Sequence, residues 1–179
     1  MRMFVSINIE DQDLIRRIRE LAFKIKDEED GINVTKEENL HFTLKFLGEI
    51  NEEQLEVLIK NMSEISFPAF SIDIKDLGVF PNLSNIRIIW IGAKSNEITE
   101  LAKVVDERSS FIKSEESFVP HLTIARVKYV RNKAELIKRI QNFARVDFGK
   151  YKVEKFYLME SKLYPSGPVY TPIKEFKLA

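Results

Sequence analysis

The chain contains only two histidines, and both lie in the same short pattern. His41 lies in residues 40–44 (LHFTL), and His121 lies in residues 120–124 (PHLTI). Polar and apolar residues alternate in both segments, which is typical of a β-strand with one buried face. Because residues two apart on a strand point to the same side, each histidine shares a face with the threonine that follows it, Thr43 or Thr123.

Two imidazoles that face one point can carry out an in-line displacement at phosphorus. A neutral histidine accepts a proton from the attacking water, and a protonated histidine donates one to the leaving oxygen; the ordinary histidine pKa of about 6.5 suits both tasks. The hydroxyls of Thr43 and Thr123 can donate hydrogen bonds to the phosphate oxygens. Arg126 would add a charged donor. Its odd spacing from His121 places it on the other strand face unless a bulge, a twist or the strand end brings it in.

The elements that must position these motifs occur in the same order in the two halves of the chain. Each half has a strand, a helix, the motif strand, a second helix and a further strand, and such repetition indicates a duplicated unit. Periodicity predicts strands at 4–9, 40–47, 70–74, 86–91, 118–127, 152–163 and 169–178. It predicts helices over 11–26, 51–65, 98–105 and 132–143, two of which begin with capping-box patterns (Asn51 with Gln54, and Asn132 with Glu135).

This order predicts an α+β fold of two similar lobes related by pseudo-two-fold symmetry. We expect each lobe to have a mixed or antiparallel sheet with two outer helices, and the active-site cleft to lie between the lobes. Residues 1–179 should form a single domain, with lobe-forming repeats at about 1–82 and 83–179, because no Gly-, Ser- or Pro-rich linker separates them. Phe42 and Phe46 alternate away from His41 and are therefore expected in the core.

Composition restricts the kind of site and substrate. Lys and Arg total 28, as do Asp and Glu, so the chain lacks the basic excess that usually accompanies extended nucleic-acid contacts. A nucleic-acid substrate should then be bound locally, at an end. There is no cysteine, there are only two histidines, and acidic residues do not cluster at metal-ligand spacing. No Gly-rich phosphate loop and no G-x-S-x-G turn is present. We therefore expect neither a metal nor another cofactor.

The N-terminal residues enter a strand-like segment without a charged and apolar leader, and no apolar run approaches membrane-spanning length. We expect a cytoplasmic protein that does not associate with membranes and acts as a monomer.

Residues 39–48 (NLHFTLKFLG) and 118–126 (FVPHLTIAR) resemble the two signature motifs of the 2H phosphoesterase superfamily. Residues 2–7 (RMFVSI) and 161–170 (SKLYPSGPVY) also look like the RNA 2′,3′-cyclic phosphodiesterases of that superfamily, also called 2′-5′ RNA ligases. The resemblance implies a two-lobed α+β fold and metal-independent hydrolysis of RNA 2′,3′-cyclic phosphate ends to 2′-phosphates. It also implies a weak reverse reaction that joins RNA ends through a 2′-5′ bond.

By the same resemblance, His41 is the general acid for the O3′ leaving group and His121 assists the attacking water. Thr43, Thr123 and Arg126 then hold the phosphate. The pseudo-symmetry leaves the reverse assignment of the two histidines open.

Other hypotheses remain. A single histidine on a strand is more often structural than catalytic, but the pairing and the resemblance together argue for the catalytic role. The same chemistry could act on a small cyclic nucleotide, on ADP-ribose cyclic phosphate or on a 2′-5′ oligonucleotide. A non-catalytic module could bind RNA ends through the same residues. The expected partner is an RNA with a 2′,3′-cyclic phosphate end, such as a tRNA fragment, but the sequence does not specify which RNA.

Overall fold

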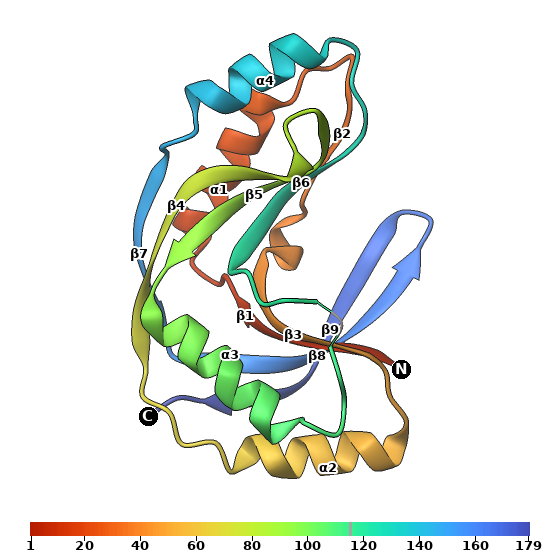
Figure 1. The fold of residues 1–179 in the computed structure, drawn as a ribbon, viewed down its shortest axis with the longest axis vertical. Coiled ribbons are helices and arrows are strands. Elements are labelled where there is room, and N and C mark those ends of the chain that lie inside the picture. The colour runs from red at the N-terminus through yellow and green to blue at the C-terminus, as the bar shows by residue number, and fades with distance from the viewer. Residues whose placement is uncertain (115) are drawn as a thin grey trace.

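The computed structural model describes residues 1–114 and 116–179. In this part of the chain a sheet of nine strands is accompanied by four α-helices and a short 3-10 turn, η1 (Glu37–Asn39) (Figure 1). The strands are β1 (Arg2–Asn8), β2 (Gly31–Val34), β3 (His41–Glu49), β4 (Phe70–Asn82), β5 (Asn85–Lys94), β6 (His121–Tyr129), β7 (Asp147–Val153), β8 (Lys155–Tyr164) and β9 (Gly167–Lys177). The helices are α1 (Gln12–Ile25), α2 (Glu52–Ser63), α3 (Asn96–Arg108) and α4 (Lys133–Asn142).

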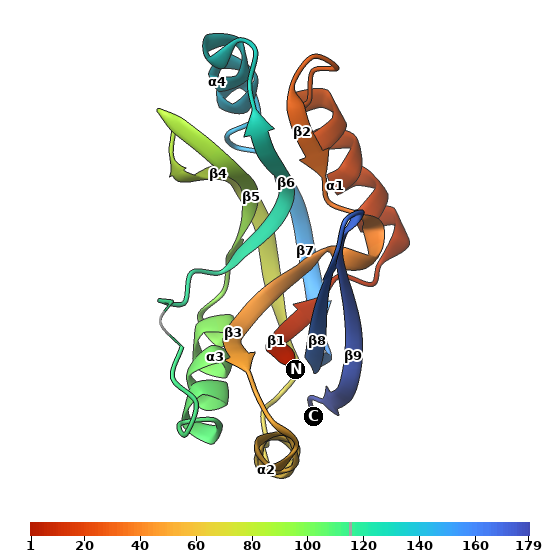
Figure 2. The ribbon, with the colours of Figure 1, turned by 90° about the vertical axis from the view of Figure 1, so that its right-hand side faces the viewer.

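The sheet has two halves that meet at the motif strands. Its order is β7-β4-β5-β6-β3-β1-β8-β9, with β2 added to β6. β3 and β6 join through the antiparallel pair Phe42–Leu122. Beyond this junction the strands run apart, β3 toward α2 and β6 toward α4 (Figure 2). The two histidines begin these two strands, so the junction also brings the two motifs together.

The α+β fold is confirmed, and the pairings described are all antiparallel. The sheet halves are not the halves of the chain, however. β8 and β9 return to pair beside β1, and β4 crosses over to pair with β5 and β7. The segments 1–82 and 83–179 are therefore interleaved in space, and each half of the sheet takes strands from both.

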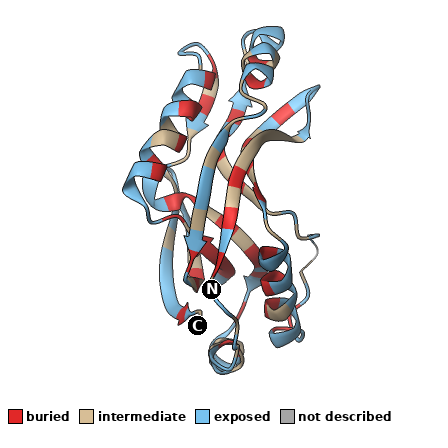
Figure 3. Cartoon of the chain, turned by 90° about the vertical axis from the view of Figure 1, so that its left-hand side faces the viewer, coloured by how far each residue is buried: buried red, intermediate tan, exposed pale blue. Residues whose placement is uncertain are grey.

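Two helices accompany each half of the sheet. Helix α1 contacts β2, β6, β7 and α4, whereas α2 and α3 lie together, α3 against β3 and α2 beside β9. Buried residues recur along one side of the helices (Figure 3). The predicted capping box of α2 is present, and the Asn132 side chain accepts a hydrogen bond from the Glu135 amide at the start of α4. No helix in the described part of the chain is both long and apolar enough to cross a bilayer.

Several predicted boundaries were wrong. The strand expected over 152–163 is two strands, because β7 pairs with β4 in one half of the sheet and β8 pairs with β1 in the other. The chain crosses between the halves at Glu154. The short strand β2 was not predicted, and β6 begins only at His121 rather than at Phe118. These boundaries depend on partners distant in sequence, which local periodicity does not contain.

Candidate active site

The two His-x-Thr segments lie on one face of the sheet at its junction. Phe42 and Leu122, the paired residues, are fully buried. Since strand side chains alternate, the histidines and threonines on either side of this pair point to the opposite face. His41, Thr43, His121 and Thr123 are all partly exposed there. The predicted sharing of a face by each histidine and its threonine is thus present in both copies.

Both imidazoles are held in the same orientation by backbone carbonyls. His41 Nδ1 lies 2.7 Å from the Asn39 carbonyl oxygen, and His121 Nδ1 lies 2.7 Å from that of Val119. A carbonyl only accepts, so Nδ1 carries the proton in both rings. In the neutral rings Nε2 is then the basic nitrogen, available for proton transfer. The Thr43 hydroxyl lies 3.0 Å from Nε2 of His41.

Aromatic side chains from distant strands enclose His41. Its ring centroid lies 5.1 Å from that of Phe4 and 5.2 Å from that of Tyr170. Burial lowers the pKa of His41 to about 4; the Asn39 carbonyl opposes this shift, and the positive charges of His121 and Arg126 add to it. His41 is therefore neutral at pH 7 in the free protein.

His121 has an aromatic surrounding of its own. Its ring meets Phe80 edge-on with centroids 5.0 Å apart, and Trp90 lies 6.3 Å away. The Trp90 ring covers Gly78 so closely that a Cβ atom there would lie 2.2 Å from the indole. The sequence pattern predicts neither these neighbours nor those of His41. They come from other strands, and no local pattern marks them.

A β-bulge follows the threonine in each motif strand. In β3 the register against β1 shifts between Thr43 and Lys45, and in β6 the register against β5 shifts between Thr123 and Ala125. An extra residue in a strand reverses the alternation beyond it. The fifth residue after each histidine therefore returns to the histidine's own face.

This reversal decides the placement of Arg126 and Phe46. The bulge that Arg126 needed in order to share the face of His121 is present. The positive charge of Arg126 contributes to the lowered pKa of His41. Phe46 occupies the matching position after His41. The expectation that Phe46 belongs to the core was wrong: it is 41% exposed, whereas Phe42 is fully buried as expected.

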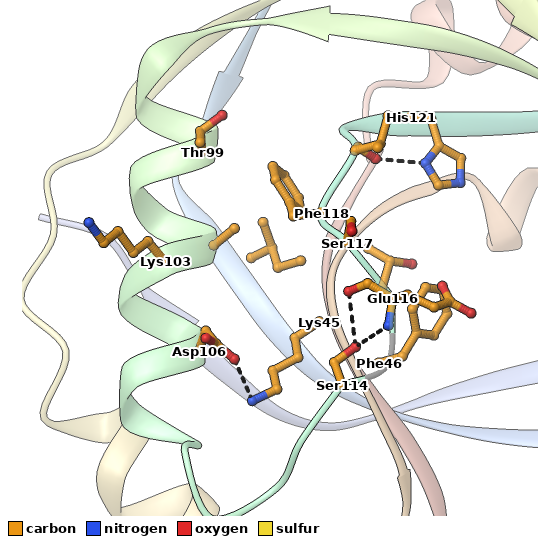
Figure 4. A pocket seen from close by; sticks show the side chains of 14 residues that line it. Lys45, Phe46, Thr99, Lys103, Asp106, Ser114, Glu116, Ser117, Phe118 and His121 are labelled. Atoms are coloured by element: carbon orange, nitrogen blue, oxygen red, sulfur yellow. Dashed lines mark hydrogen bonds and ion pairs between the residues drawn. The ribbon is translucent and has the colours of Figure 1, made fainter.

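A cavity of about 340 Å³ opens beside His121, where β3 separates from the segment that leads into β6. Thr43, Phe46 and Phe118 line it together with His121, and α3 forms its far wall through residues such as Thr99 and Lys103 (Figure 4). Apolar rings and a few polar groups thus adjoin the two motifs, which suits a ligand with a flat apolar part next to a phosphate.

The family model described as LigT like Phosphoesterase matches the chain twice, over residues 9–90 and 91–170. The chain belongs to this family. The double match also confirms the predicted internal repeat. The RNA 2′,3′-cyclic phosphodiesterase of Methanocaldococcus jannaschii is 42% identical over 98% of this chain and 100% of that protein. The protein of the same name from Archaeoglobus fulgidus is 36% identical over 99% of this chain and 100% of its own.

Solved structures of the family share the fold. TT0787 of Thermus thermophilus has a TM-score of 0.83 at 28% identity, covering 99% of this chain and 98% of that one. Escherichia coli LigT complexed with 3′-AMP has a TM-score of 0.82 at 25% identity, with coverage of 99% and 98%. The resemblance to the 2H phosphoesterases is therefore confirmed at the level of family and fold.

Taken together, the site holds two imidazoles of the same tautomer, hydroxyls that can bind phosphate oxygens and a guanidinium on the same face. Such a set can transfer one proton to a leaving oxygen and remove one from a nucleophile while a phosphate is held between them. All of these groups are supplied by one chain.

Proposed function

We propose that this protein hydrolyses the 2′,3′-cyclic phosphate end of an RNA to a 2′-phosphate without a metal ion, with His41 and His121 as the acid–base pair. The observation that carries the proposal is the matched anchoring of both Nδ1 atoms at 2.7 Å on paired strands, which makes Nε2 the basic nitrogen of each neutral ring. Nε2 of His41 lies 3.0 Å from the Thr43 hydroxyl. Water attacks phosphorus while one imidazole accepts its proton. The bond from phosphorus to O3′ breaks, and the other imidazole protonates O3′.

The same chemistry accounts for a weak ligation reaction. If the 5′-hydroxyl of a second RNA replaces water as the nucleophile, O3′ leaves in the same way and a 2′-5′ bond forms. Water is present at far higher concentration than RNA ends, so hydrolysis dominates.

The two histidines differ in their environments, and this bears on their roles. The acid role for His41 requires that it be protonated in the complex, although its pKa is lowered to about 4 in the free protein. The negative charge of a bound cyclic phosphate favours the protonated ring and raises this pKa. The family resemblance gives the acid role to His41 and the base role to His121, and we keep that assignment; it requires this rise in the pKa of His41 in the complex.

Thr43, Thr123 and Arg126 are the proposed phosphate ligands. Both hydroxyls lie on the histidine face, and the bulge in β6 brings Arg126 to it. A guanidinium donates charge-assisted hydrogen bonds to the non-bridging oxygens, where negative charge increases in the transition state.

The terminal nucleoside occupies the cavity beside His121 in this proposal. The exposed ring of Phe46 and the ring of Phe118 offer apolar faces to a base there. The substrate is an RNA end, tRNA fragments included. We infer a cytoplasmic monomer, because RNA is processed in that compartment and one chain supplies the whole site.

The test is turnover of an oligonucleotide with a 2′,3′-cyclic phosphate end in excess EDTA. We expect the wild type to release a 2′-phosphate product, and His41→Ala and His121→Ala each to lose roughly 10²–10⁴-fold in rate. Lys150→Ala, a change in an exposed ion pair with Asp73, serves as the control. Binding without turnover would support an RNA-end-binding module instead. Turnover of small cyclic nucleotides alone would move the assignment to a small-molecule substrate.

A further inference from the structure

Lys45 follows Thr43 by two residues, so plain alternation would direct it into the cleft beside His41 and Thr43. The bulge in β3 turns it the other way. Its side chain is only 2% exposed and is itself among those that line the cavity beside His121. Figure 4 shows it reaching toward Asp106 on α3. A buried ammonium group is costly unless it is fully partnered, so its position calls for a role.

The Lys45 ammonium group is bonded to the end of α3 and to the turn that follows. Nζ lies 2.7 Å from Asp106 Oδ1, 3.1 Å from the Ser109 carbonyl oxygen and 2.7 Å from the Ile112 carbonyl oxygen. It also lies 3.0 Å from Ser109 Oγ, whose hydroxyl donates to the Val105 carbonyl oxygen. A cation at the C-terminal end of a helix is favoured by the helix dipole. Lys45 therefore fastens α3 and the 109–112 turn to the first motif strand.

These fastened elements form the wall of the cavity beside His121. Helix α3 contributes Thr99, Ala102, Lys103 and Asp106 to that wall. Beyond the turn, Phe118 and Val119 line the cavity. The residue that matches Lys45 after the second histidine is Ala125, which has no polar side chain. The contacts that Lys45 makes through its ammonium group therefore have no counterpart at Ala125.

We propose that Lys45 is a positioning residue that fixes the wall of the nucleoside-binding cavity through Asp106, Ser109 and Ile112. It sets affinity for the nucleoside part of the substrate rather than the chemistry at phosphorus. This inference rests on the proposed function, because it takes the cavity to hold the terminal nucleoside.

The experiment compares two substrates that share the reacting group. One is adenosine 2′,3′-cyclic phosphate, and the other is methyl β-D-ribofuranoside 2′,3′-cyclic phosphate, which has no base. For Lys45→Met we expect KM for the adenosine substrate to rise roughly tenfold or more with kcat within about threefold of wild type. Both parameters for the substrate without a base should stay within about threefold. Lys45→Arg, which keeps the charge, should recover part of the affinity.

Arg139→Met is the matched control, since it removes an ion pair with the buried Asp30 between α4 and the turn before β2, outside the cavity lining. This variant should leave the ratio of the KM values for the two substrates as it is in the wild type. If Lys45→Met does not fold, the variant Asp106→Asn can replace it. This change removes the negative charge that pairs with Lys45, at a residue that is exposed, and should shift KM in the same direction.

Equal losses on both substrates, or no change on either, would overturn the positioning role. Failure of the wild type to hydrolyse either substrate or the oligonucleotide with a 2′,3′-cyclic phosphate end would overturn the proposed function instead. Turnover of the oligonucleotide alone would place the binding energy beyond the terminal nucleoside and would overturn the positioning role. Hydrogen exchange provides a second readout: amides 116–119 should exchange faster in Lys45→Met, while those of β1 keep wild-type rates. Unchanged exchange at 116–119 would also contradict the inference.

Discussion

The ring of Tyr170 meets the ring of His41 edge-on, with an interplanar angle of 84° and centroids 5.2 Å apart. These residues are distant in sequence, and β9 carries the tyrosine to the start of β3. The contact contributes to the burial that lowers the pKa of His41 to about 4. An element outside both motifs therefore contributes to the burial of one catalytic candidate.

Tyr170→Ala should raise the pKa of His41 from about 4 toward the ordinary value, because it opens the ring to water. A titration of the imidazole resonances by NMR measures this directly. Tyr164→Ala, at the exposed end of the same hairpin, should leave the midpoint where it is in the wild type. An unchanged midpoint in Tyr170→Ala would mean that other residues bury the ring.

Binding of inorganic phosphate or 2′-AMP should raise the same pKa to near or above neutrality, since an anion beside the ring favours the protonated form. The measurement is the same titration at saturating ligand. If His41 stayed neutral at pH 7 in the complex, the acid and base roles of the two histidines would have to be exchanged.

The lowered pKa also predicts how stability depends on pH. Between pH 6.5 and about 4 the unfolded chain binds a proton at His41 that the folded protein does not, so stability falls as the pH falls through this window. The contribution of the lowered His41 pKa to the free energy of unfolding is fully present above pH 6.5 and amounts to at most about 3 kcal/mol. Urea denaturation should show a shallower pH dependence across this window in His41→Asn than in the wild type. Equal slopes would argue against a depressed pKa.

Arg126→Ala should lower kcat/KM by roughly 10–100-fold, the effect of losing a charge-assisted hydrogen bond to the phosphate. Arg126→Lys should restore only part of the loss, because an ammonium group lacks the bidentate geometry. Steady-state kinetics of the two variants separate the contribution of the positive charge from that of the bidentate geometry. Wild-type kinetics in Arg126→Ala would place the guanidinium outside the phosphate site.

Gly78→Ala should disturb the surroundings of His121. A Cβ atom at this position would lie 2.2 Å from the indole of Trp90, which must then move. We expect a loss of about 1–3 kcal/mol in the free energy of unfolding, the usual cost of overpacking, and a lower kcat as His121 loses its support. Thermal unfolding and steady-state kinetics measure the two effects. An unchanged melting temperature would show that the indole moves without cost.

Much of the site followed from the sequence because its determinants are local. The alternation around His41 and His121 put each histidine on the face of its threonine, and the repeat placed the two motifs at equivalent positions. The capping pattern at Asn51 and Gln54 likewise fixed the start of α2, since a cap is formed within a few residues. The double family match agrees with that repeat.

The tertiary structure decided what depends on pairing between distant strands. A bulge forms against a neighbouring strand, so alternation alone placed Phe46 in the core and left Arg126 uncertain. The same bulge buries Lys45, although it has the spacing of a cleft residue. The aromatic walls of the two histidines come from β1, β4, β5 and β9, and the split of one expected strand into β7 and β8 follows from their different partners. Periodicity predicts the face of its own strand on which a side chain lies, but only the assembled sheet determines which residues that side chain contacts.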